Sequence, residues 1–159
     1  RYYQAARQYD ADVIVRITGD CPLIDPLIVD RVIQAFSRKD VDYASNVCPR
    51  TWPDGLDTEV FSFRLLEETW KHAVDAYTRE HVTPSMSGNS QIHKVNVHNA
   101  VDCSKVRWTI DEYTDLKIVE DIVDYFYPNQ IFGYEDIVAV KDQRPSWFSC
   151  IDYSIGRAS

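Results

Sequence analysis

Two kinds of hydrophobic pattern follow each other closely along the chain. Short apolar runs or strict alternation, typical of β-strands, occur at residues 13–17, 41–45, 57–63, 91–98 and 106–110. Apolar positions recur at helical spacing within residues 26–36, 65–74 and 116–126, and shorter helices are expected near 2–9, 77–82 and within 129–140. This order predicts an α/β layered fold with a mostly parallel, mixed sheet and some antiparallel edge pairing around residues 57–63 or 91–98.

Length and composition narrow the class of protein. The 159 residues are 45% hydrophobic, which is enough for one packed domain and excludes a disordered chain. A formal charge of −8 argues against a nucleic-acid surface, and no apolar run is long enough to suggest a membrane span. We expect one domain over residues 1–143, then a tail over 144–159 that lacks a clear period and whose role is open.

The four cysteines have neither the C-x-x-C spacing of a redox dithiol nor a zinc-site pairing with histidine. Free thiols in a reducing cytoplasm are therefore expected.

Two aspartates lie where a predicted strand ends. Asp20 follows the strand 13–17 in a Thr-Gly-Asp-Cys-Pro loop, in which Gly19 is expected to allow a sharp turn, and Asp111 follows the strand 106–110. Carboxyl ends of strands in α/β sheets form ligand-binding crevices, and two carboxylates from separate loops can share a magnesium ion. The alternative is that each is a turn or helix-cap residue.

The loop Pro53–Glu59 carries three carboxylates. Asp57 and Glu59 are two residues apart in an extended segment, which puts them on one face, where this pair can accept hydrogen bonds from sugar hydroxyls. A solvated acidic turn is the alternative.

Three further residues are candidates for anion or sugar contacts. Arg79 and His81 lie within one helical turn, where an arginine can bind a carboxylate or phosphate through two hydrogen bonds. An exposed helix face is the alternative for this pair. Arg107, inside a predicted strand, either enters the site or covers apolar surface with its stem.

Five ordered motifs together resemble one family. They are residues 15–26, 42–46, 54–61, 79–84 and 107–111. The resemblance is to the cytidylyltransferases of the spore-coat polysaccharide biosynthesis protein F type, related to the synthetases of CMP-sialic acid and CMP-Kdo. It implies a Rossmann-like, three-layer nucleotide-diphospho-sugar transferase fold.

The resemblance also implies an activity, a cofactor and partners. The expected reaction is magnesium-dependent transfer of CMP from CTP to an acidic sugar with release of pyrophosphate, for surface polysaccharide or glycan biosynthesis, by a cytoplasmic homodimer. Asp20 and Asp111 match the metal ligands and catalytic residues of the family. The substrate-binding candidates are Arg16, Asp54, Asp57, Glu59, Arg79, His81 and Arg107.

One family motif has no counterpart here. The family's glycine-rich Gly-Ser-x-Arg-Leu-Pro-Gly-Lys loop, which holds the triphosphate, would lie before Arg1. The fold is therefore expected to be incomplete at its N-terminus, and the chain by itself inactive. A non-catalytic sugar-binding or scaffolding subunit is the alternative. A glycosyltransferase with a D-x-D pair ranks lower, because Asp10-Ala11-Asp12 precedes its strand instead of following it.

Overall fold

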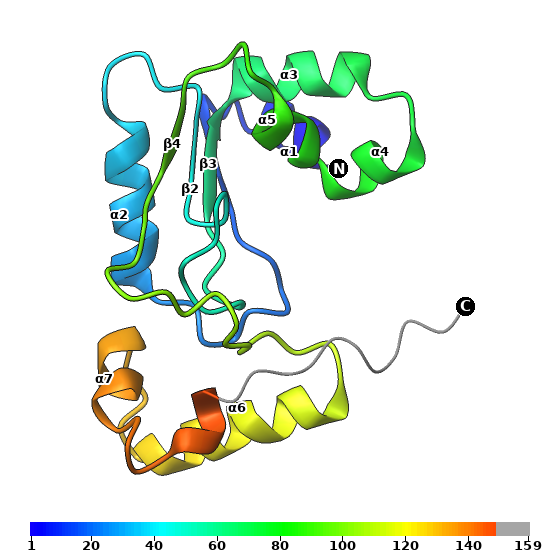
Figure 1. Cartoon of the computed structure of the whole chain (residues 1–159). Helices are drawn as coiled ribbons and strands as arrows, with labels where there is room; N and C mark the ends of the chain where they lie inside the picture. Colours follow the sequence, from blue (N-terminus) through cyan, green and yellow to red (C-terminus); the bar gives the residue numbers. More distant parts are fainter. Residues whose placement is uncertain (149–159) are drawn as a thin grey trace. The chain divides into compact units, whose positions relative to one another are not determined.

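The computed structural model describes residues 1–148, except for the side chain of Glu80, and has mixed α/β architecture (Figure 1). The chain forms two compact units from interleaved segments. The first unit comprises Arg1–Ile17, Val29–Pro49 and Thr58–Val97. The second comprises Thr18–Ile28, Arg50–Asp57 and the described residues from His98 onward.

A four-stranded mixed sheet forms the centre of the first unit. Its strands are β1 (Val13–Arg16), β2 (Tyr43–Ser45), β3 (Glu59–Ser62) and β4 (Lys94–Asn96), in the order β1-β3-β2-β4. β3 runs antiparallel to both of its neighbours, and β2 pairs with β4 in parallel. The α/β fold with a mixed sheet is confirmed. Among the described strands, however, the sheet is not mostly parallel, and the antiparallel pairing lies at its centre because β3 is placed between β1 and β2.

The two faces of this sheet follow the alternation of the strand side chains. Ile14, Tyr43 and Phe61 pack with residues of α1 (Tyr2–Gln8), α3 (Phe63–His72) and α5 (Pro84–Gly88). Ala44 and Val60, each adjacent in sequence to one of those residues, pack against α2 (Pro26–Phe36). Successive side chains of a strand point to opposite faces, so the alternation produces three layers.

The second unit has its own apolar core, built around three tryptophans. It contains α6 (Tyr113–Phe126), α7 (Tyr134–Ala139) and the 3₁₀ helix η1 (Pro145–Phe148). Trp52, Trp108 and Trp147 are buried together, and the indole of Trp108 donates to the carbonyl of Trp147 at 2.8 Å. The segment predicted as a tail from residue 144 therefore begins with a packed helix, and residues 149–159 lie outside the described part.

One predicted strand is absent from the described sheet. Residues 106–110 belong to none of the strands of the described sheet, and a parallel bridge joins Arg107 to Asp54. The backbone groups of this segment bond the loop 50–57 instead: Asp54 N donates to Val106 O at 2.8 Å and Trp108 N donates to Asp54 O at 2.6 Å. An apolar run has the same appearance in a strand and in a buried extended loop, which explains the difference.

The predicted helices are present with shifted ends. The region 63–82 contains α3 and then α4 (Ala76–His81), whose N-cap Asp75 accepts a hydrogen bond from Thr78 N at 2.8 Å. No helix in the part of the chain that the structure describes is long and apolar enough to cross a membrane.

Candidate functional site

Backbone hydrogen bonds join three acidic loops within the second unit. Ile110 N donates to the carbonyl of Asp20 at 2.9 Å, so the residue before Asp111 is bound directly to Asp20. The bridge between Asp54 and Arg107 adds the loop 50–57 to the same segment. Residues far apart in sequence thus share one local framework.

Glycine at position 55 makes this framework possible. Gly55 has a φ of +113°, and a Cβ atom there would lie 2.7 Å from both Thr109 N and Trp108 C. Any side chain would push the two segments apart. Gly19 lies in a turn with Asp20, as expected, but no heavy atom lies within 4 Å of the position that a Cβ would take and its φ is not positive, so neither close packing nor backbone conformation requires glycine there.

Asp20 presents an exposed carboxylate on its loop. A hydrogen bond from the Thr18 side chain lowers the pKa of Asp20 and outweighs the effect of partial burial, which would raise it. Asp20 is therefore ionised at neutral pH, as a ligand of a hard cation must be.

Asp111 is also accessible, with 56% of its side chain exposed. It lies outside α6, whose N-cap is Glu112, so the alternative that Asp111 caps this helix is wrong. Asp111 Oδ2 accepts a hydrogen bond from Arg107 Nη2 at 2.5 Å.

Arg107 binds carboxylates of its own unit. Besides Asp111 it contacts Asp115, which is 3% exposed, with Nη2 2.8 Å from Oδ2. Of the two sequence interpretations, these bonds favour the one in which Arg107 enters the site, because its guanidinium contacts Asp111 and is anchored by the buried Asp115. Its contact with substrate stays a prediction. Asp115 was not among the residues predicted from the sequence, although it lies four residues after Asp111 in the first turn of α6, a spacing that places the two residues close together.

Asp54 and Asp57 both contact the guanidinium of Arg50, a residue that was not predicted from the sequence. Arg50 Nη1 lies 3.2 Å from Asp54 Oδ1, and Arg50 Nη2 donates to Asp57 Oδ2 at 2.7 Å. Burial raises the pKa of Asp54, and the nearby Arg50 opposes that shift. Both side chains are partly exposed, so their carboxylates are accessible to a ligand while Arg50 holds them in place.

Glu59 is buried, whereas Asp57 is partly exposed. Glu59 is 5% exposed, and its carboxylate accepts hydrogen bonds from Arg16, Tyr43 and Thr83 within the first unit. The structure thus corrects the expectation of an exposed carboxylate pair, because Glu59 is directed into the interior.

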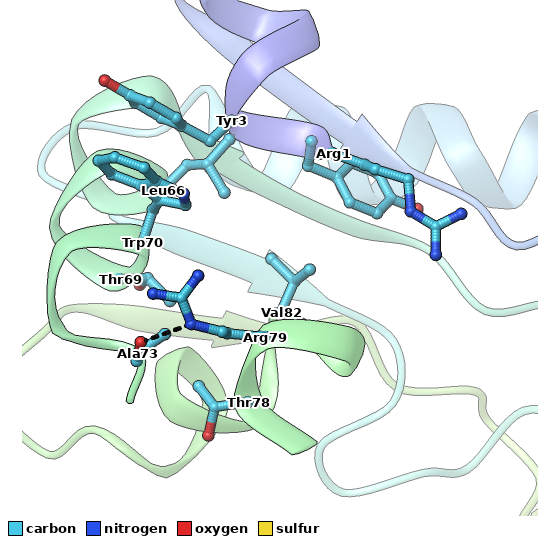
Figure 2. Close-up of a pocket in the computed structure, with 10 residues that line it drawn as sticks. Arg1, Tyr3, Leu66, Thr69, Trp70, Ala73, Thr78, Arg79 and Val82 are labelled. Carbon is cyan, nitrogen blue, oxygen red and sulfur yellow. Dashed lines mark hydrogen bonds between the residues drawn. The ribbon is translucent and has the colours of Figure 1, made fainter. Parts of the chain in front are cut away.

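Arg79 and His81, at the end of α4, are exposed. Arg79 Nε donates to the carbonyl of Ala73 at 3.0 Å, and the His81 ring lies 4.4 Å from that of Tyr77. With Tyr3, Leu66 and Trp70, Arg79 lines a hollow of about 90 Å³, and its guanidinium is turned toward Ala73 (Figure 2).

Comparison with known proteins gives the family. The sequence matches the cytidylyltransferase family over residues 1–152, and the chain belongs to this family. It is 37% identical over 129 residues to the uncharacterized protein MJ1063 of Methanocaldococcus jannaschii, a match that spans 79% of this chain and 52% of that protein. It is 27% identical over 149 residues to the spore coat polysaccharide biosynthesis protein SpsF of Bacillus subtilis, spanning 91% of this chain and 61% of SpsF.

A solved structure agrees with this assignment. A cytidylyltransferase from Leptospira borgpetersenii serovar Hardjo-bovis matches with a TM-score of 0.87 and 32% identity, over 96% of this chain and 66% of that one. The chain therefore spans about half to two thirds of the length of these relatives. The family and fold that the motifs predicted are confirmed.

Proposed function

We propose that the protein containing this chain is a nucleotidyltransferase that moves CMP from CTP to an acidic sugar and releases pyrophosphate, in the biosynthesis of a surface polysaccharide or glycan. The observation that carries the proposal is the hydrogen bond between Ile110 N and Asp20 O, which joins the loops of two exposed aspartates. Membership of the cytidylyltransferase family supports nucleotidyl transfer, and the name of SpsF supports the polysaccharide product.

The donor set fits a magnesium ion that is completed by substrate. Magnesium prefers oxygen ligands and commonly takes one or two carboxylates from protein, with phosphate oxygens and water supplying the rest. Asp20 and Asp111 are such carboxylates. Within residues 1–148, no group of three or more His, Cys, Asp or Glu side chains is arranged to hold a metal ion.

In the proposed mechanism, a bound magnesium ion would neutralise phosphate charge and align the sugar oxygen with the α-phosphate. The residues of this chain prepare the site. Asp20 stays ionised because its pKa is low, and Arg107 fixes Asp111 through its own bond to Asp115. Arg50 holds Asp54 and Asp57, which we assign to the sugar side. Direct attack by the sugar oxygen needs no covalent protein nucleophile.

The test measures pyrophosphate release by the full-length gene product with CTP, Mg²⁺ and a panel of acidic sugars. Asp20→Asn keeps the size of the side chain and removes its charge, and we expect turnover to fall by at least about 100-fold, as for loss of a metal-binding group. Asp30→Asn, an exposed aspartate on α2, is the matched control and should leave turnover unchanged.

Two outcomes count against the proposal. Full turnover by Asp20→Asn would reject the metal role. Absence of turnover by the wild-type protein with every sugar would favour the scaffolding alternative. The homodimer is a separate proposal, which light scattering on the same protein tests.

A further inference from the structure

The carboxylate of Glu59 links three separate segments of the first unit. Oε1 accepts from the hydroxyl of Tyr43 on β2, and Oε2 accepts from Arg16 on β1 and from the Thr83 hydroxyl, at 3.1 Å, after α4. Both oxygens are thus occupied inside the protein. A buried charge with this set of donors is costly to disturb, and it fixes the positions of the groups bound to it.

The segment after α4 needs such a fixed point. Val82, between His81 and Thr83, has φ +62° and ψ −56°, a conformation that a β-branched residue rarely adopts. Strained residues of this kind persist where the surrounding structure holds them in place. The bond from Thr83 to Glu59 holds the chain directly after the strained residue.

Arg16 and Val82 line the same concave surface. A hollow of about 500 Å³ is bounded by Arg1, Tyr2, Ala5, Arg16, Arg79 and Val82. Among these lining residues three are arginines and none is acidic. The smaller hollow of Figure 2 shares Arg79 and Val82 with it, and there Arg79 is oriented by its bond to Ala73. Oriented guanidinium groups in a recess are suited to an oxyanion.

We propose that Glu59 is a positioning residue that, through Arg16 and Thr83, holds β1 and the segment 79–83 around this hollow, which receives an anionic group of a substrate. The inference rests on the proposed function, because that reaction supplies two oxyanions: the carboxylate of an acidic sugar and the phosphates of CTP. It replaces the expectation that Glu59 itself contacts sugar.

The principal experiment compares Thr83→Val with Thr83→Ser in the full-length protein. Valine keeps the volume but lacks the hydroxyl bonded to Glu59, whereas serine retains it. We expect Thr83→Val to raise the KM of one substrate about 10-fold at nearly constant kcat, the size of effect expected for losing a hydrogen bond to a charged group. Thr83→Ser should behave as wild type. The substrate whose KM changes, acidic sugar or CTP, identifies the anion.

A second pair of variants separates positioning from general packing. Glu59→Gln removes the charge that holds Arg16, and should raise the same KM. Tyr43→Phe removes another donor to the same carboxylate but lies on β2 and does not line the hollow. It should raise that KM less than Thr83→Val does, because Arg16 and Thr83 keep their bonds to Oε2 of Glu59. Circular dichroism establishes which variants are folded.

The inference is overturned if folded Thr83→Val keeps both wild-type KM values, or if Tyr43→Phe raises the same KM equally. If the wild-type protein shows no turnover, the proposed function fails. The inference about the hollow is then tested separately, by measuring ligand binding with titration calorimetry. Titrations with inorganic pyrophosphate and with the acidic sugars should then show binding that Arg79→Gln and Thr83→Val weaken about 10-fold. Absence of binding, or equal affinities in all three proteins, overturns it.

Discussion

Arg107 and Asp115 form a two-point ion pair beneath the exposed Asp111. Arg107 Nη2 lies 2.8 Å from Asp115 Oδ2, and Arg107 Nε lies 3.2 Å from both oxygens. Asp115 Oδ2 also accepts from the amides of Asp111 and Glu112, each at 3.0 Å. One buried carboxylate therefore anchors an arginine and the start of α6 together.

Removing this carboxylate should destabilise the second unit. Asp115→Ala leaves Arg107 without its buried partner, and breaking a buried ion pair costs about 3–5 kcal/mol of unfolding free energy. Urea unfolding followed by tryptophan fluorescence measures the loss. The exposed Asp124→Ala on the same helix is the control, and an equal loss in both variants would contradict a special role for Asp115.

The same pair should respond to acid. Burial would raise the pKa of Asp115, but the hydrogen bonds from Arg107 and the two amides outweigh it and lower the pKa. Ionised Asp115 therefore stabilises the fold above its unfolded-state pKa of about 3.9, and this stability is lost as the pH falls below that value. Unfolding free energies measured between pH 3 and 7 should fall less steeply in Asp115→Asn than in wild type; parallel curves would refute the pKa shift.

Gly55 should tolerate no side chain. Gly55→Ala places a methyl group against the backbone of Trp108 and Thr109 and also strains a positive φ, so we expect a loss of more than about 1 kcal/mol. Gly19→Ala meets open space and should change stability by less than about 0.5 kcal/mol. Thermal unfolding of the two variants provides the comparison, and equal midpoints would show that the close approach at Gly55 is absent in solution.

The thiols should differ in reactivity. Cys21, Cys48 and Cys103 are free among the described residues, as the sequence predicted. Burial raises the pKa of Cys21 to about 11, whereas Cys48 is exposed. Because the thiolate is the reactive form, iodoacetamide at pH 8 should label Cys48 at least about 10-fold faster than Cys21. Peptide mass spectrometry measures both rates, and comparable labelling would contradict the burial of Cys21.

The sequence by itself determined the local features of this protein. Periodicity located the helices and most strands, because side-chain direction repeats every 3.6 residues in a helix and every two in a strand. The ordered motifs identified the cytidylyltransferase family, and Asp20 and Asp111 were singled out because they follow apolar runs. These features depend on neighbouring residues along the chain.

The tertiary structure decided which distant residues meet. Only the fold places β3 antiparallel between β1 and β2, turns Glu59 inward to Arg16 and Thr83, and pairs Arg107 with Asp115. It also shows that residues 106–110 bond a loop instead of a strand. Hydrogen bonds and burial between segments depend on how the whole core packs, and a one-dimensional pattern of apolar and polar residues does not contain that information.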